Sequence, residues 1–307
     1  MSSWALTLRR RGLSDDSTGW PRGNRPAARI TRPCAAVRRW RRILPWPNGG
    51  GCVCACRATS SARWSWIFRC IPGRFFSQQG DDPVEDRLLS ELQALLEACR
   101  QRGVEVFVIG GFGVRAYGSL LRRTLDLDLA VAAKAWHALA EVLNTQGYRL
   151  SSAGIWATAT KGEGEEAVEI HIAVGDVVDV QSAARYPVGI EPGIVRPLPD
   201  SDIALPVFTL EGLLITKLMA LRDNDVVDIV ALLLQHAEQV DAARFWHQVE
   251  EAELETLLED RLAELEEILQ SKEVNAIWWD RLGLMLDEGE QRLVLMAVRR
   301  LRRPIYR

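Results

Sequence analysis

Two carboxylates interrupt an apolar stretch, since Asp126 and Asp128 alternate with leucines in TLDLDLAV (124–131). Burying an ionised carboxylate is costly unless it is paired or binds a metal. In a strand, alternation sends both acids to one face and the leucines to the other. Carboxylates about 7 Å apart can bind Mg²⁺ or Mn²⁺, and two such ions stabilise nucleotidyl transfer. The spacing therefore indicates metal-dependent phosphate chemistry.

A glycine pair precedes these acids, because VEVFVIGG ends in Gly110 and Gly111. Glycine lets the backbone approach a phosphate closely at the start of a helix. A two-ion site also needs a third carboxylate on a neighbouring strand. The downstream stretch AVEIHIAVGDVVDVQS (167–182) offers Asp179 and Glu169.

The same stretch predicts a hairpin with a three-residue loop, Val174 to Asp176, and a left-handed Gly175. One face would then carry Ile170, Ile172, Val178 and Val180, and the other Glu169, His171, Asp179 and Gln181. We interpret His171 as a polar surface residue, because hard cations prefer oxygen ligands.

Taken together, GGFGVRAYG and RRTLDLDLAV resemble the signature of the DNA-polymerase-β-type nucleotidyltransferase superfamily. The stretches VVDVQSAARYP and LPVFTLEGLLITKLMALRDNDVVDIVALL are similar to small bacterial nucleotidyltransferases of the abortive-infection toxin type. The resemblance spans residues 104–235. The spacer between Gly111 and Asp126 has 14 residues, about one more than is usual in the family.

This resemblance implies roles for individual residues. It implies Mg²⁺ or Mn²⁺ at Asp126 and Asp128, with Asp179 as the third acid and Glu169 as the fallback. Nucleotide binding would involve Gly110, Gly111, Arg123, Thr124 and Lys217, with accessory roles for Arg222 and Asp225.

Structural interpretations compete with some of these roles. Lys217 would extend its ammonium from an amphipathic helix to solvent, and Asp225 and Asp228 would cap a helix or pair with Arg222. The leucines of 248–270 favour a helical-bundle core over a dimer zipper, because they span only about three heptads.

The hydrophobic pattern predicts an α+β fold, with a small mixed sheet, helices on one face and a C-terminal helical bundle. We expect a helix from Pro83 that closes at Gly103, and a helix capped by Thr209. The other expected elements are strands at 104–111 and 125–131, helices at 113–117 and 132–147, extended segments at 149–160 and 167–182, a proline-rich crossing at 187–206 and helices after 221. The predicted domains are 82–238 and 239–307.

Residues 1–81 differ sharply from the rest. The first 80 residues hold 15 arginines, no lysine and two acids, which leaves 23 basic and 39 acidic residues in the remainder. A nucleic-acid-binding arm and a transit peptide are alternatives, but the lack of periodicity favours a disordered extension. The spacing of Cys52, Cys54 and Cys56 is not that of a structural zinc site.

No 18-residue apolar run and no disulfide framework are present, which suits a cytoplasmic protein. Cys99 is expected to be a buried small hydrophobe. The favoured function is transfer of a nucleoside monophosphate from an NTP to a hydroxyl of RNA, a protein or a small molecule. The alternative is a catalytically degenerate binding module, such as one half of a toxin–antitoxin pair.

Overall fold

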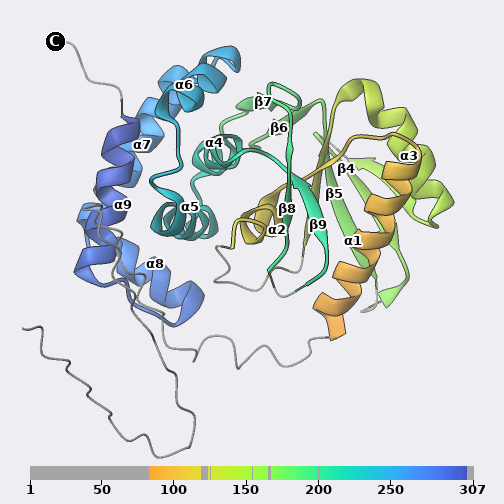
Figure 1. Ribbon diagram of the computed structural model, residues 1–307, viewed down its shortest axis with the longest axis horizontal. Coiled ribbons are helices and arrows are strands. Elements are labelled where there is room, and N and C mark those ends of the chain that lie inside the picture. Colours follow the sequence, from red (N-terminus) through yellow and green to blue (C-terminus); the bar gives the residue numbers. More distant parts are fainter. Residues whose placement is uncertain are drawn as a thin grey trace, which may run out of the picture. The chain divides into compact units, whose positions relative to one another are not determined.

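The computed structural model describes residues 83–302 except 119–123, 125, 154, 165, 166 and 200. A seven-stranded mixed sheet in the order β3-β4-β5-β2-β1-β9-β8 forms its centre, and β6 and β7 pair separately (Figure 1). The strands are β1 (Phe107–Val108), β2 (Leu127–Val131), β3 (Arg149–Ala153), β4 (Trp156–Lys161), β5 (Val168–Val174), β6 (Asp176–Val178), β7 (Arg185–Pro187), β8 (Ile194–Pro197) and β9 (Ala204–Val207).

Helices pack beside this sheet. They are α1 (Pro83–Gln101), α2 (Gly110–Arg115), α3 (Trp136–Thr145) after a 3-10 turn η2 (Ala133–Ala135), α4 (Leu210–Ala220), α5 (Asp223–His236), α6 (Ala242–Glu251), α7 (Glu255–Gln270), α8 (Glu273–Leu282) and α9 (Glu288–Leu301). The α+β class, the mixed sheet and the C-terminal helical segment are therefore as predicted. The prediction for residues 1–81 lies outside the described residues.

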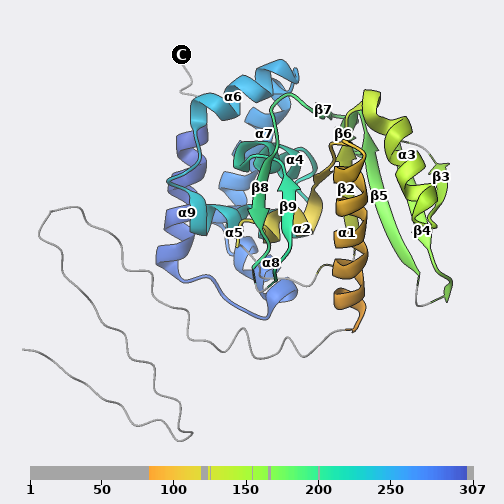
Figure 2. The ribbon, with the colours of Figure 1, turned by 45° about the vertical axis from the view of Figure 1, so that its right-hand side comes forward.

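The leucines of TLDLDLAV form part of the core, as their alternation predicts. Leu127 and Leu129 are fully buried and face the same side as Ile170 and Ile172 of the parallel neighbour β5. Figures 1 and 2 show α1 and α3 side by side next to this part of the sheet. The opposite side of β2 carries Asp128, which remains partly exposed.

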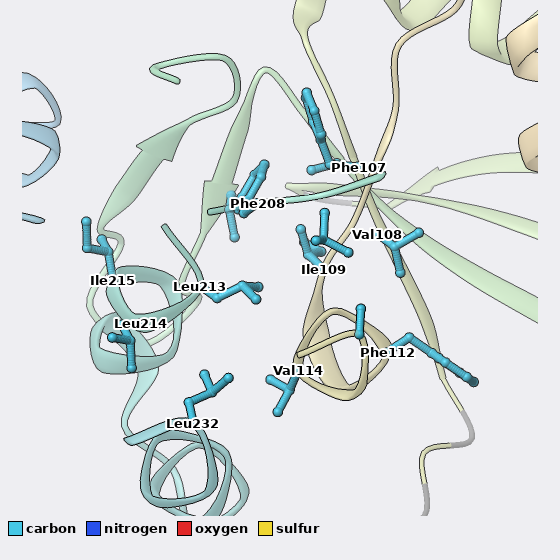
Figure 3. Packing of buried hydrophobic residues seen from close by; sticks show 14 of the residues in the cluster. Phe107, Val108, Ile109, Phe112, Val114, Phe208, Leu213, Leu214, Ile215 and Leu232 are labelled. Carbon is cyan, nitrogen blue, oxygen red and sulfur yellow. The ribbon is translucent and has the colours of Figure 1, made fainter. Parts of the chain in front are cut away.

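Packing of α2 against α4 and α5 fixes the position of the glycine pair. Figure 3 shows Leu213 of α4 and Leu232 of α5 close to Val114 of α2. The helix α4 begins where predicted, because the Thr209 hydroxyl accepts a hydrogen bond from Gly212 N at 3.2 Å. The first residue of α2 is Gly110, so the expected strand 104–111 is shortened to β1 and the helix begins three residues earlier than predicted.

The predicted hairpin at 167–182 is wrong. The strand β5 pairs with β2 and β4, whereas β6 pairs with β7. Gly175 does adopt the left-handed conformation, with φ of +82°, but there the chain passes from one sheet to the other. As a result Val180 does not join Ile170 on a buried face, since 66% of it is exposed.

The proline-rich crossing at 187–206 contains two unpredicted strands, β8 and β9.

The leucines of α7, in the C-terminal helical region, are core residues, as predicted, because Leu258, Leu262, Leu265 and Leu269 are all fully buried. Cys99 is also buried as expected, and burial raises its thiol pKa to about 11.

Candidate active site

Strand pairing brings Asp128 next to β5. The register places Asp128 opposite His171, with Leu127 opposite Ile170. Asp126 immediately precedes β2 and is exposed. In parallel strands, residues that occupy corresponding positions share a face, so Asp128 lies on the side of the sheet that carries Glu169 and His171, and Asp126 precedes it by two residues. We call these four residues the acidic face.

A histidine connects two acids of the acidic face. His171 Nδ1 lies 3.4 Å from Asp128 Oδ1, and His171 Nε2 lies 2.9 Å from Glu169 Oε1. The hydrogen bond to Asp128, together with that to Glu169, outweighs partial burial and raises the pKa of His171 to about 9. The two neighbouring carboxylates therefore favour the protonated imidazole.

Neither glycine position has room for a Cβ atom. A Cβ atom at Gly110 would overlap Oδ2 of Asp128, and one at Gly111 would overlap the hydroxyl of Thr124. The φ of Gly110 is +62°, which also favours glycine. The buried Thr124 hydroxyl makes no hydrogen bond within the described part of the chain. The glycine pair thus allows α2 to begin directly beside one acid and one unsatisfied hydroxyl.

Asp179 follows β6 in a different environment. Its carboxylate accepts hydrogen bonds from Ser182 N at 2.8 Å, from Ser182 Oγ at 2.7 Å and from Arg222 Nη2 at 2.9 Å. Only 2% of its side chain is exposed. Burial alone would raise the pKa of Asp179, but the Ser182 hydrogen bonds and the Arg222 charge hold it below its usual value.

Lys217 forms ion pairs with two aspartates that follow it closely in the sequence, Asp225 and Asp228. Lys217 Nζ lies 2.9 Å from Asp225 Oδ1 and 2.8 Å from Asp228 Oδ2. Asp225 also accepts a hydrogen bond from Arg222 N, which caps α5. Burial lowers the pKa of Lys217, but Asp228 and Asp225 outweigh this effect and raise it. We call Asp179, Lys217, Arg222, Asp225 and Asp228 the buried ion cluster.

The candidate residues therefore divide into two groups. Asp126, Asp128, Glu169 and Gly110 belong to the acidic face or border it, whereas Asp179 and Lys217 belong to the buried ion cluster. Within the described residues, no three His, Cys, Asp or Glu side chains come close enough together to hold a metal ion. Arg123 lies outside the described residues. The oxygen donors of the acidic face nevertheless match the chemistry of a hard divalent cation, and 27% of the Asp128 side chain is exposed.

A family model described as "Uncharacterised nucleotidyltransferase" matches residues 85–270, which is more than half of the chain. The chain belongs to this nucleotidyltransferase family. No curated protein matches it.

The helices of the described part include none long and apolar enough to cross a membrane.

Solved structures similar to this nucleotidyltransferase include three of low identity. JHP933 from Helicobacter pylori is 11% identical, with 72% of this chain and 92% of that chain covered and a TM-score of 0.44. The antibiotic-resistance factor ANT(2″)-Ia is 17% identical, with 61% and 97% covered and a TM-score of 0.36. The lincosamide antibiotic adenylyltransferase LnuA is 18% identical, with 41% and 83% covered and a TM-score of 0.31. The family assignment rests on the family model alone.

Two features of this candidate site have no counterpart in the predictions from the sequence. His171 contacts both Asp128 and Glu169, which depends on the pairing of β5 with β2 and has no local signal. Ser182 N donates a hydrogen bond to the carboxylate of Asp179, which lies three residues earlier in the sequence. An Asp-x-x-Ser spacing is a recognisable signal for such a local turn.

Proposed function

We propose that this protein transfers a nucleoside monophosphate from an NTP to an acceptor hydroxyl, as in the DNA-polymerase-β-type superfamily. The acceptor oxygen bonds to the α-phosphorus, the bond from that phosphorus to the oxygen bridging to the β-phosphate breaks, and pyrophosphate leaves. The hydroxyl proton passes to solvent. The same resemblance supports a cytoplasmic location, where NTPs are available, a catalytic region at 82–238 and a helical region at 239–307.

The observation that carries this proposal is the position of Asp128 on an open sheet face, directly beside Gly110 at the start of α2. Asp126 precedes the same strand, so both carboxylates can bind the same ligand. Bound Mg²⁺ or Mn²⁺ would neutralise the triphosphate and make the acceptor hydroxyl more acidic. The unsatisfied hydroxyl of Thr124 supports its role as a donor to a phosphate oxygen.

For the third acid, the contacts favour Glu169 over Asp179. Glu169 occupies the strand next to Asp128, and 57% of its side chain is exposed. All the contacts of Asp179 described above are internal, and its side chain is almost inaccessible. We therefore propose Glu169 as the third carboxylate and Asp179 as a residue that positions Arg222.

Lys217 fits a positioning role better than direct contact with the triphosphate. Its ammonium already contacts Asp225 and Asp228, and only 11% of its side chain is exposed. A buried cation with two carboxylate partners is costly to detach from them. We propose that Lys217 holds α4 and α5 together.

The experiment incubates the full chain with each α-³²P-labelled NTP, Mg²⁺ and cell extract. Label transfer that is lost in Asp128→Asn supports the enzyme. Glu169→Gln should reduce kcat by about 100-fold or more if it binds the cation, whereas Asp179→Asn should act mainly through stability. A label that does not depend on Asp128 would contradict the proposal.

One observation favours the alternative, a degenerate binding module that pairs with an antitoxin. Both Asp179 and Lys217, which the family resemblance implies in catalysis, are engaged in internal ion pairs. A module would bind an NTP in equilibrium dialysis without any transfer of label. It would also show the same NTP affinity in Glu169→Gln as in the native chain.

A further inference from the structure

The acidic face continues into a row of hydroxyl groups on the next two strands. Antiparallel pairing places Thr158 of β4 opposite His171 and Thr160 opposite Glu169. Beyond them, Ser151 of β3 lies opposite Thr158. Directly paired residues share a face of the sheet. We call Ser151, Thr158 and Thr160 the hydroxyl row.

This part of the sheet is open on the side of the hydroxyl row. Ser151 is exposed and the two threonines are partly exposed, whereas Ala157 and Ala159, which alternate with the threonines, are buried on the other side. None of the three hydroxyls makes a hydrogen bond to another described residue. They are therefore available to a molecule that lies across β4 and β3.

The charges around the hydroxyl row argue against a nucleic acid. A polynucleotide strand needs several cations along its phosphates. Lys161 alternates to the other face, where its Nζ lies 2.8 Å from Glu91, and the Arg149 guanidinium lies 3.5 Å from the Gly162 carbonyl oxygen at the end of the strand. The described residues of this face carry the acids Asp126, Asp128 and Glu169 against two cations, His171 and Arg149. Its described part therefore has no row of cations that could follow the phosphates of a polynucleotide.

We propose that the hydroxyl row is the acceptor subsite and that the acceptor is a small polyhydroxylated molecule without phosphate, neutral or cationic. This inference rests on the proposed function. Adjacent strands lie about 4.8 Å apart, so Thr158 is about 10 Å from Asp128 across β5. That span suits a molecule of one or two sugar-sized rings, with one hydroxyl at the acidic face and others bonded to the row.

The first test divides a cell extract into RNA, protein and small-molecule pools, and passes the small-molecule pool over an anion exchanger. Each pool is incubated with the full chain, Mg²⁺ and the four α-³²P-labelled NTPs. We expect label in the pool that the anion exchanger does not retain. Label in RNA, protein or the retained anions would overturn the inference but leave the proposed function intact. Absence of any Asp128-dependent label would overturn both.

The second test uses Thr158→Val and Ser151→Ala in the full chain. Loss of one hydrogen bond to the acceptor should raise its KM by ~5- to 10-fold and leave the KM for the NTP within ~2-fold. Thr256→Val, at an exposed threonine of α7, is the matched control and should change neither value. An unchanged acceptor KM in both variants would overturn the assignment of the hydroxyl row.

Discussion

The acidic face and the buried ion cluster both contain carboxylates with cationic partners, but they differ in how far these side chains are exposed. In the buried ion cluster, Lys217 and Asp225 are each about one-tenth exposed and contact each other directly. In the acidic face, Asp128 and Glu169 keep 27% and 57% of their side chains exposed, with one shared partner, His171. Carboxylates that are fully paired stabilise the fold but offer no oxygen to a ligand. The exposed ones can exchange an internal partner for a cation.

Because the two regions differ in burial, catalysis and stability should depend on different residues. Removing a charge from the buried ion cluster leaves its partners in a medium of low polarity, where an uncompensated charge is costly. Removing a charge from the acidic face leaves the remaining groups in contact with water, where the cost is small. Substitutions should therefore affect the free energy of unfolding in one region and turnover in the other.

The largest loss of stability is expected for Lys217→Met, which keeps the length of the side chain but leaves Asp225 and Asp228 without their shared cation. We expect the free energy of unfolding to fall by about 3–5 kcal/mol, measured by urea denaturation. Under conditions where the variant stays folded, the KM for the NTP should change little. A loss below about 1 kcal/mol, or a large increase in this KM, would show that Lys217 belongs to the nucleotide site instead.

Asp128→Asn should give the converse result. We expect turnover to fall by at least about 100-fold, because an amide oxygen is a poor ligand for a divalent cation. The free energy of unfolding should change by less than about 1 kcal/mol, because the lost pair with His171 is partly exposed. Measuring both quantities on one preparation tests the comparison directly. A variant that is active, or one that is unfolded, would refute it.

Gly110→Ala tests how closely α2 approaches the acidic face. Its positive φ costs about 1–2 kcal/mol for a residue with a Cβ, and the new atom would displace the Asp128 carboxylate. Gly103→Ala is the matched control, since Gly103 has φ of +66° but nothing within 4 Å of the added atom. Gly110→Ala should lose at least as much stability as Gly103→Ala, whereas turnover should fall by about tenfold only in Gly110→Ala. Equal turnover in the two would exclude a role for this contact.

The local parts of the fold could be predicted from the sequence, because their signals lie within a few residues. The Thr209 cap, the buried Leu127 and Leu129, and the left-handed Gly175 each follow from one residue and its neighbours. The pairing partner of each strand does not follow from such local signals. The strand β5 could have paired with β6 or with β2, and only the whole sheet decides between them.

The same limit applies to the candidate site. Asp126, Asp128 and Gly110 lie within one short stretch, and their spacing predicted that they would lie close together. The third acid depends on the pairing of β5, so the sequence left Asp179 and Glu169 as alternatives. Strands β8 and β9 escaped prediction because each has four residues and contains a proline, Pro197 or Pro206, which normally indicates a loop.

The smallest expected effect is the pH dependence of the stability that His171 contributes. Its pKa of about 9 in the folded protein exceeds the usual value of 6.5, so the protonated imidazole stabilises the fold. This stabilisation is fully present below about pH 6.5 and is lost as the pH rises through 9. Because the side chain is 38% exposed, we expect His171→Asn to cost less than about 1 kcal/mol at pH 6 and nothing at pH 10.

Urea midpoints of the native chain and of His171→Asn at pH 6, 8 and 10 would measure this difference. His137→Asn, at an exposed histidine that lies 3.3 Å from Glu141, controls for the loss of a surface imidazole. If the difference between the native chain and His171→Asn grows rather than shrinks as the pH rises, the imidazolium does not stabilise the acidic face. In that case the two carboxylates would be held apart by other groups, and the contrast with the buried ion cluster would rest on exposure alone.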